Sequence, residues 1–208
     1  MLKVQNITKS SLPDISFEIE SGVIGITGGN GADRSALLSI IAGVMAPDSG
    51  HIYIDEYDIS VYPTESKRAT GYMAESMSFY EDMTSYEFLV FIGEAKKIQS
   101  EKLHKQIGEA LDLLDITHIS DVLISNIRAD EKKFLGVAST LLGNPDIIIL
   151  DSPFKNISPS DKEKLSHIIK MLGTMKVVII SDENSAALDE IASEVITLSS
   201  DSEMEVGE

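Results

Sequence analysis

Residues 25–43 read GITGGNGADRSALLSIIAG, which is a glycine-rich turn between a β-branched run and an apolar helical pattern. Phosphate-binding loops of the form G-x-x-x-x-G-K-[ST] have this layout, because glycines let backbone N–H groups converge on phosphate and the lysine neutralises it. Four positions match: Gly28, Asn30, Gly31 and Ser35. Asp33 replaces the second glycine and Arg34 replaces the lysine. The stretch predicts the scaffold of a phosphate site with a carboxylate where a triphosphate would bind.

Strand patterns on both sides of this turn predict the fold class. Short β-branched runs bounded by turn residues recur at 23–27, 146–150, 176–181 and 194–198, and helical patterns separate them. This order is typical of buried parallel strands joined by crossover helices, so we expect an α/β core. Runs at 2–8, 14–19 and 51–54 predict an antiparallel N-terminal flank, which makes the sheet core mixed.

The middle of the chain has a different periodicity. Between about residues 83 and 142 the strand signal disappears and apolar residues recur at helical spacing, which predicts a helical insert. We expect residues 1–208 to form a single domain with this insert. The tail 201–208 carries four acidic residues and is expected to be disordered.

Composition limits the partners of the chain. The 208 residues carry a formal net charge of -17, which argues against nucleic-acid binding, because such proteins need a basic surface. No cysteine is present, which is consistent with a cytoplasmic protein. The first ten residues lack the apolar segment of a signal peptide, and no apolar run approaches membrane-spanning length. We therefore expect no membrane insertion, and any membrane role would require docking at the inner face.

Four further stretches carry a family resemblance. In chain order they read LLSIIAGVMAPDSGHIYIDEYDIS, GYMAESMSFYEDMTSYEFLVFIGEAKKI, LLGNPDIIILDSPF and VVIISDENSAALDEIASEVITL. With the glycine-rich turn, their order and spacing resemble the ATP-binding subunits of ABC transporters across nearly the whole chain. The resemblance implies a P-loop NTPase fold of the ABC ATPase type.

The same resemblance places altered residues at the reacting positions. Asp151 keeps the carboxylate that holds magnesium in the family, but Ser152 stands where the family has the glutamate that polarises the attacking water. Glu183 occupies the position of the switch histidine, and Glu75 occupies that of the glutamine-loop residue. The signature motif falls on residues 127–131, where an acidic first turn of a helix is the favoured interpretation. We therefore expect no catalytic residue at these positions.

If nucleotide binding survives, the resemblance assigns Mg-ATP to named residues. The nucleotide contacts would come from Gly28, Asn30, Gly31, Arg34, Ser35 and Glu75, and the magnesium contacts from Ser35 and Asp151. A carboxylate about 4 Å from a phosphate oxygen costs on the order of 4 kcal/mol at an effective dielectric constant of about 20, or roughly a thousandfold in affinity. We expect Arg34 to pair with Asp33 or Asp151 and so fill the anion site from within.

Three functions follow from these residues. The first is a degenerate subunit without ATPase activity that acts as a structural or regulatory partner of a membrane permease, with or without a second ATP-binding subunit. The aromatic residues Tyr80, Tyr86, Phe88 and Phe91 of the insert motivate docking, although we expect at least half of them to be ordinary core. The second is a functional ATP-hydrolysing subunit of an ABC transporter. The third is a soluble regulatory interaction module.

Overall fold

Five parallel strands form the sheet that carries the glycine-rich turn. The computed structural model describes residues 1–10 and 12–198, so the predicted tail at 201–208 lies outside the described residues. The strand order is β6-β7-β8-β3-β9. The bounds are β3 (Gly22–Gly28), β6 (Thr70–Met73), β7 (Ile147–Leu150), β8 (Val177–Ser181) and β9 (Glu194–Leu198). Four of these strands match the predicted runs, whereas β6 has no counterpart among the predictions.

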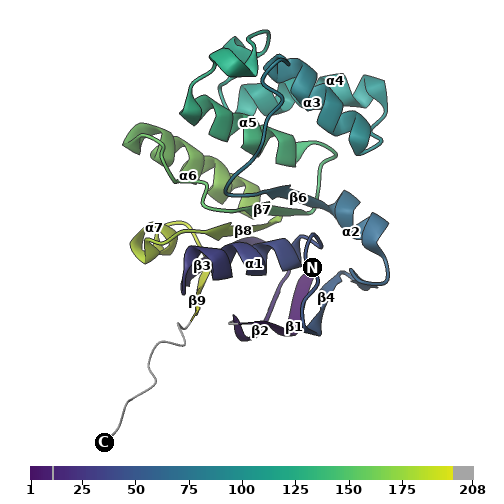
Figure 1. Cartoon of the computed structure of the whole chain (residues 1–208), viewed down its shortest axis with the longest axis vertical. Coiled ribbons are helices and arrows are strands. Elements are labelled where there is room, and N and C mark those ends of the chain that lie inside the picture. The colour runs from purple at the N-terminus through teal and green to yellow at the C-terminus, as the bar shows by residue number, and fades with distance from the viewer. Residues whose placement is uncertain (11, 199–208) are drawn as a thin grey trace, which may run out of the picture.

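A second sheet is antiparallel throughout and confirms the predicted N-terminal flank. Its order is β2-β1-β4-β5, with β1 (Leu2–Lys9), β2 (Leu12–Ile19), β4 (Ser49–Ile54) and β5 (Tyr57–Asp58). The core therefore contains both strand directions, but each direction has its own sheet. Helix α1 (Gly31–Ile41) lies between the two sheets (Figure 1). Its apolar residues join those of both sheets in one buried cluster, which fixes the helix that follows the glycine-rich turn.

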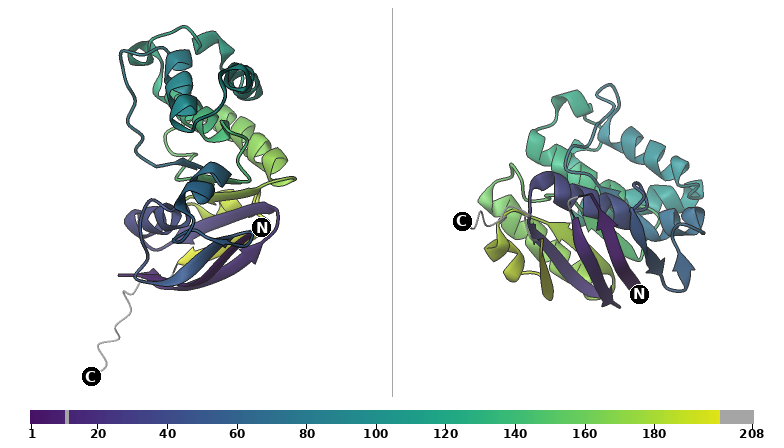
Figure 2. Two further views of the ribbon diagram at one scale, coloured as in Figure 1. Left: turned by 90° about the vertical axis from the view of Figure 1, so that its right-hand side faces the viewer. Right: turned by 60° about the horizontal axis from the view of Figure 1, so that its bottom comes forward.

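Helices dominate the segment predicted as an insert. It contains α3 (Ser85–Ala95), α4 (Ser100–Leu113), α5 (Ala129–Leu141) and the short 3₁₀ turns η1 (Thr117–Ile119) and η2 (Ile124–Asn126). Figure 2 shows these helices at the end of the molecule away from the antiparallel sheet. The remaining helices are α2 (Pro63–Ala69), α6 (Pro159–Gly173) and α7 (Ser185–Asp189). The α/β P-loop fold class is confirmed, while the insert as a separate unit stays a prediction.

The four aromatic residues considered for docking divide between the core and the surface. Phe88 is only 1% exposed, and its ring centroid lies 5.2 Å from that of Phe79. Tyr86 is half-buried against the same core, and its hydroxyl is hydrogen-bonded to a ring nitrogen of a histidine on α4 at 2.7 Å. Tyr80 and Phe91 form an exposed edge-to-face pair. Half of the set is thus core, as expected, and the other half faces outward.

Candidate functional site

The glycine-rich turn begins where β3 ends. Gly28 has φ 71° and Gly29 has φ 56°, a left-handed backbone region that L side chains rarely adopt. A Cβ atom at Gly28 would lie 2.4 Å from the carbonyl oxygen of Leu198 on the neighbouring strand β9, so only glycine fits there. This turn reverses the chain at the carboxyl end of the parallel sheet and starts α1 at Gly31.

The N-terminus of α1 is capped by side chains of the turn itself. Asn30 Oδ1 accepts a hydrogen bond from the N–H of Asp33 at 2.9 Å, and Asp33 Oδ2 accepts one from the N–H of Asn30 at 3.5 Å. This reciprocal arrangement is a capping box, and it also places a carboxylate at the positive end of the helix. Two N–H groups that a phosphate would use therefore already have acceptors.

Arg34 lies inside the turn and is only 8% exposed. Its guanidinium donates to the carbonyl oxygen of Gly28 at 2.9 Å and to that of Gly29 at 3.4 Å. The predicted ion pair with Asp151 is wrong, because one guanidinium nitrogen donates to the loop carbonyls instead, while the buried Nε of Arg34 has no hydrogen-bond partner among the described residues. Asp33 is the other predicted partner, and its carboxylate accepts the hydrogen bond from the N–H of Asn30 that forms part of the capping box. The positive charge is therefore held by backbone dipoles of the turn.

Asp151 follows β7 and is fully buried. Its Oδ1 accepts a hydrogen bond from Ser181 Oγ at 2.7 Å, whereas its Oδ2 has no hydrogen-bond partner among the described residues. A buried carboxylate oxygen without a hydrogen-bond partner is unfavourable, and a bound cation or a water molecule on that cation would supply the missing contact. Sequence reasoning missed Ser181, although it ends β8, the strand that pairs with β7.

Ser152 is tied to the same pair of residues. Its backbone has φ 50°, its N–H donates to Ser181 Oγ at 2.9 Å, and its hydroxyl is directed at Asp151 Oδ1 at 3.4 Å. A serine hydroxyl at this position is not a carboxylate base. The absence of the family's base at this position stays a prediction.

A cavity of about 420 Å³ brings some of the predicted site residues together, whereas Gly28, Asn30, Ser35 and Asp151 are not part of its lining. Gly31, Arg34, Glu75, Ser152 and Glu183 line it, together with Phe154, Lys155, Asn156, Lys162, Asp182 and Asn184. Lys155 forms an ion pair with Glu75, and this contact raises the pKa of the lysine. Three cationic side chains face three carboxylates in the cavity, so it is less negative than the sequence suggests.

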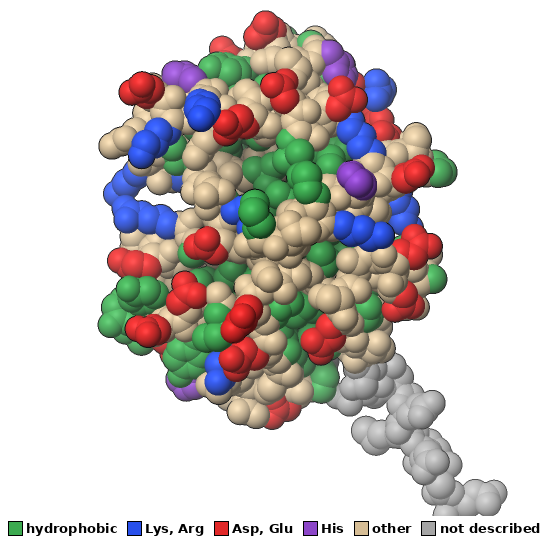
Figure 3. All heavy atoms as spheres, turned by 180° about the vertical axis from the view of Figure 1, so that it is seen from behind, with side chains coloured by type: hydrophobic (Ala, Val, Ile, Leu, Met, Phe, Trp, Pro, Cys, Tyr) green, Lys and Arg blue, Asp and Glu red, His purple; other side chains and the backbone are tan. Residues whose placement is uncertain are grey.

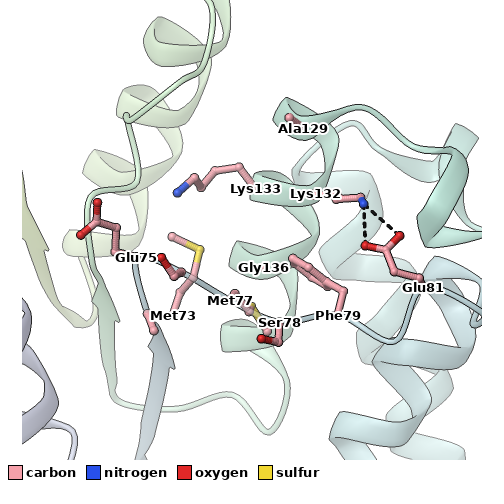
Figure 4. A pocket seen from close by; sticks show the side chains of 12 residues that line it. Met73, Glu75, Met77, Ser78, Phe79, Glu81, Ala129, Lys132, Lys133 and Gly136 are labelled. Atoms are coloured by element: carbon pink, nitrogen blue, oxygen red, sulfur yellow. Dashed lines mark hydrogen bonds and ion pairs between the residues drawn. The ribbon is translucent and has the colours of Figure 1, made fainter.

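A second cavity of about 560 Å³ lies behind Glu75 and is shown in Figure 4. Lys133 extends into it from α5, in the direction of Glu75, and donates to the carbonyl oxygen of Ser152 at 3.3 Å. Burial lowers the pKa of Lys133. Its neighbour Lys132 pairs with Glu81 at 2.8 Å. Sequence reasoning missed Lys133, because a lysine near the start of a helix carries no signal of burial.

Charged side chains pair with one another in residues 127–131, where the family has its signature motif. Glu131 is only 7% exposed and accepts hydrogen bonds from the N–H of Arg128 at 2.8 Å and from His118 at 2.9 Å. The Arg128 guanidinium lies 2.9 Å from Asp130 and 3.1 Å from Glu131. Helix α5 is therefore capped by its own first turn, as the favoured interpretation of this segment predicts.

We expect Glu131→Gln to lower the free energy of unfolding near neutral pH by about 1–2 kcal/mol. Burial acts to raise the pKa of Glu131, but the hydrogen bonds from Arg128 and His118 and the charge of Arg128 bring it below its ordinary value. A lowered pKa in the folded state gives stability that is present above the unfolded-state pKa and is lost as pH falls through the folded-state pKa.

Urea unfolding of both proteins near neutral pH and at about pH 3 measures this effect. The difference between the wild type and the variant should shrink at the lower pH. A difference that stays constant over this range would show that the carboxylate charge of Glu131 does not stabilise the cap.

The site fits Mg-ATP at one end only. The unpartnered Oδ2 of Asp151 suits a cation, and Ser35 stands in the first turns of α1, as the magnesium assignment requires. The phosphate end does not fit, because the capping box of Asn30 and Asp33 already occupies the helix N-terminus. Among the described residues, no group of three or more histidine and carboxylate side chains forms a metal site.

Comparison with known proteins gives consistent results. The sequence profile described as ABC transporter matches residues 12–155. The molybdate/tungstate import ATP-binding protein WtpC of Pyrococcus abyssi is 30% identical over 82% of this chain and 51% of its own length. WtpC of Methanocaldococcus jannaschii is 29% identical over 90% of this chain and 64% of its own length. The chain therefore spans less than two thirds of these two relatives.

A shorter relative and a solved structure match over most of their lengths. The lipopolysaccharide export system ATP-binding protein LptB of Haemophilus influenzae is 29% identical over 88% of this chain and 80% of its own length. A dimeric bacterial ABC transporter cassette superposes with a TM-score of 0.85, covering 96% of this chain and 94% of that chain at 20% identity. The structural likeness supports the fold, and the profile covers more than half of the sequence. The chain belongs to the ABC transporter family.

Proposed function

We propose that this chain is the ATP-binding-cassette subunit of an ABC transporter and that its own nucleotide site does not hydrolyse ATP. It would act as a structural or regulatory partner of a membrane permease. The observation that carries the proposal is the capping box at the N-terminus of α1, where Asp33 supplies the negative charge that a phosphate supplies elsewhere in the family.

Two physical arguments support the loss of hydrolysis. Phosphate entering the turn would have to displace the Asp33 carboxylate or remain close to it, at a cost on the order of 4 kcal/mol. Ser152 offers no base for an attacking water, and its hydroxyl is directed at Asp151. The first argument concerns affinity and the second concerns the chemical step, so either defect alone would slow turnover.

Family membership supports the proposed partners. ATP-binding cassettes generally work with membrane permeases and dimerise, and one similar cassette has been solved as a dimer. Across residues 1–10 and 12–198, no helix has the length and apolar character needed to cross a bilayer. On family membership we place the chain at the cytoplasmic face of the membrane, beside a permease and a second ATP-binding subunit. The net charge of -17 argues against a nucleic-acid partner.

A functional ATP-hydrolysing subunit is the second candidate. Three observations favour it: the relatives above are named ATP-binding proteins, one similar cassette was solved with ADP and Pi, and Asp151 keeps an unpartnered oxygen suited to a cation. The balanced charges of the cavity also reduce the repulsion that an entering anion would meet.

Phosphate release in the presence of Mg-ATP separates the two candidates. We expect the purified chain, alone and with its permease, to release phosphate at the background rate of a Ser35→Ala/Asp151→Ala variant. Turnover above that background, and lost in the double variant, would refute the proposal and establish the second candidate.

A further inference from the structure

The cavity of about 560 Å³ behind Glu75 has a lining that differs from that of the cavity at the glycine-rich turn. Residues 73–79 and Glu81 contribute to one part of it, and the first two turns of α5 contribute to the other. We call it the methionine pocket, after Met73 and Met77. Its volume lies in the range of sites that bind small organic molecules.

Apolar side chains supply a large part of the methionine pocket (Figure 4). Met73 is buried, and Met77 and Phe79 are half-buried against the same core cluster. A Cβ atom at Gly136 would lie 3.0 Å from Met73 Sδ and 3.3 Å from Met77 Sδ, so both thioethers lie against the backbone of α5. Because methionine side chains are flexible and polarisable, they can adjust to the shape of an apolar group that enters the pocket.

Both carboxylates that line the methionine pocket already have cationic partners. Glu75 forms an ion pair with Lys155, which lies outside the lining. Glu81 forms an ion pair with Lys132 at 2.8 Å. Neither glutamate therefore needs a further cation.

Lys133 is the cation that remains. It is half-buried, and no ion pair joins it to a carboxylate of residues 1–10 and 12–198. Its hydrogen bond to the carbonyl oxygen of Ser152 is long, at 3.3 Å. Burial lowers the pKa of Lys133, which means that its ammonium group is poorly solvated. An anion bound beside this group would supply the counter-charge that it lacks.

We propose that the methionine pocket binds a small organic monocarboxylate with an apolar body. The carboxylate accepts a hydrogen bond from the ammonium group of Lys133, and the apolar body packs on Met77 and Phe79. One negative charge matches the one cation without a partner, whereas a second would be repelled by Glu75 and Glu81. This site goes beyond the proposed function, because it requires neither ATP nor a permease.

The rest of the molecule does not attract anions. The net charge is -17, and Figure 3 shows acidic side chains spread over the face seen from behind. Nonspecific association with such a chain favours an amine over a carboxylate of the same size. A preference for the carboxylate therefore requires a local cation, and Lys133 supplies it.

The test compares octanoate with octylamine, which have the same apolar body and opposite charges near neutral pH. Equilibrium dialysis of each radiolabelled compound against the full chain, in the absence of nucleotide, measures both affinities. We expect octanoate to bind at least about tenfold more tightly than octylamine. Equal affinities, or tighter binding of octylamine, would overturn the proposal.

Matched charge variants locate the carboxylate. Lys133→Gln removes the ammonium group and keeps a polar side chain, so it should weaken octanoate binding by about tenfold or more. Lys102→Gln removes the same charge from an exposed position on α4 that does not line the pocket, and it should change binding by no more than about twofold. Equal losses in the two variants would reduce the effect to net charge and would overturn the proposal.

A second pair of variants tests the site without altering Lys133. Ser78 is exposed and lines the methionine pocket, so Ser78→Glu adds a carboxylate there and should also weaken octanoate binding by about tenfold. Ser21→Glu adds the same charge at an exposed position outside the lining and should leave the affinity within about twofold. Unchanged binding in Ser78→Glu would place octanoate elsewhere and would overturn the proposal. Thermal melts check that all four variants fold.

Discussion

Replacing Asp33 with glycine and Arg34 with lysine is expected to raise the affinity of the chain for Mg-ATP by about a thousandfold. Removal of the carboxylate opens the capping box at Asn30 and relieves a repulsion on the order of 4 kcal/mol. The lysine restores a compact ammonium on a flexible stem, whereas the guanidinium of Arg34 donates to the carbonyl oxygens of Gly28 and Gly29. Isothermal titration calorimetry of both proteins measures the change.

Single substitutions separate charge from shape in this experiment. Asp33→Asn keeps the size of the side chain and removes its charge, so it should recover a large part of the gain. Arg34→Lys alone should recover little, because the carboxylate remains. Micromolar affinity in the wild-type chain, or no gain in the double variant, would contradict the idea that Asp33 excludes phosphate. Loss of the cap costs about 1 kcal/mol, which the fold should tolerate.

Phe88→Ala is expected to lower the free energy of unfolding by about 3–5 kcal/mol. Phe88 is buried on α3, and its ring packs against Phe79 in the segment that follows Glu75. Truncation would leave a cavity in the cluster that joins α3, α4 and α5 to the parallel sheet. Urea denaturation followed by circular dichroism gives the change, provided that the slopes of the two curves agree.

Phe91→Ala is the matched control, since it removes the same side chain from the same helix. Phe91 is 40% exposed and contacts the exposed ring of Tyr80, so its loss should cost no more than about 1.5 kcal/mol. Comparable costs for the two variants would mean that α3 contributes less to the core than its burial indicates. A variant that loses permease binding while keeping its stability would assign Phe91 to docking.

The elements that could be predicted are those with a strong local pattern. The strands β3, β7, β8 and β9 are short β-branched runs between turn residues, and burial on both faces of β3, β7 and β8 produces that pattern. The strand β6 (Thr70–Met73) was missed because it contains Gly71 and lacks a run of β-branched residues. A Cβ at Gly71 would lie 2.1 Å from the carbonyl oxygen of Thr140. The glycine is therefore needed because α5 packs closely on β6, and a local sequence pattern does not reveal such a tertiary contact.

Motif spacing selected several residues that line one cavity, but their roles stay predictions and their contacts could not be predicted. Motif spacing identified Arg34, Glu75, Ser152 and Glu183, which the fold brings to one cavity. Of the two partners predicted for Arg34, Asp151 is wrong, because the guanidinium donates to carbonyl oxygens whose positions are set by the backbone of the turn.

The position of α1 between the two sheets limits which molecules the glycine-rich turn can bind. Leu37, Leu38, Ile40 and Ile41 are buried against strands on both sides, so the C-terminal part of the helix is fixed between the two sheets. This packing holds the helix that carries the glycine-rich turn in one position. A bound molecule must therefore fit the backbone geometry of the turn. Evolution can change what this site binds by exchanging side chains while the backbone stays the same.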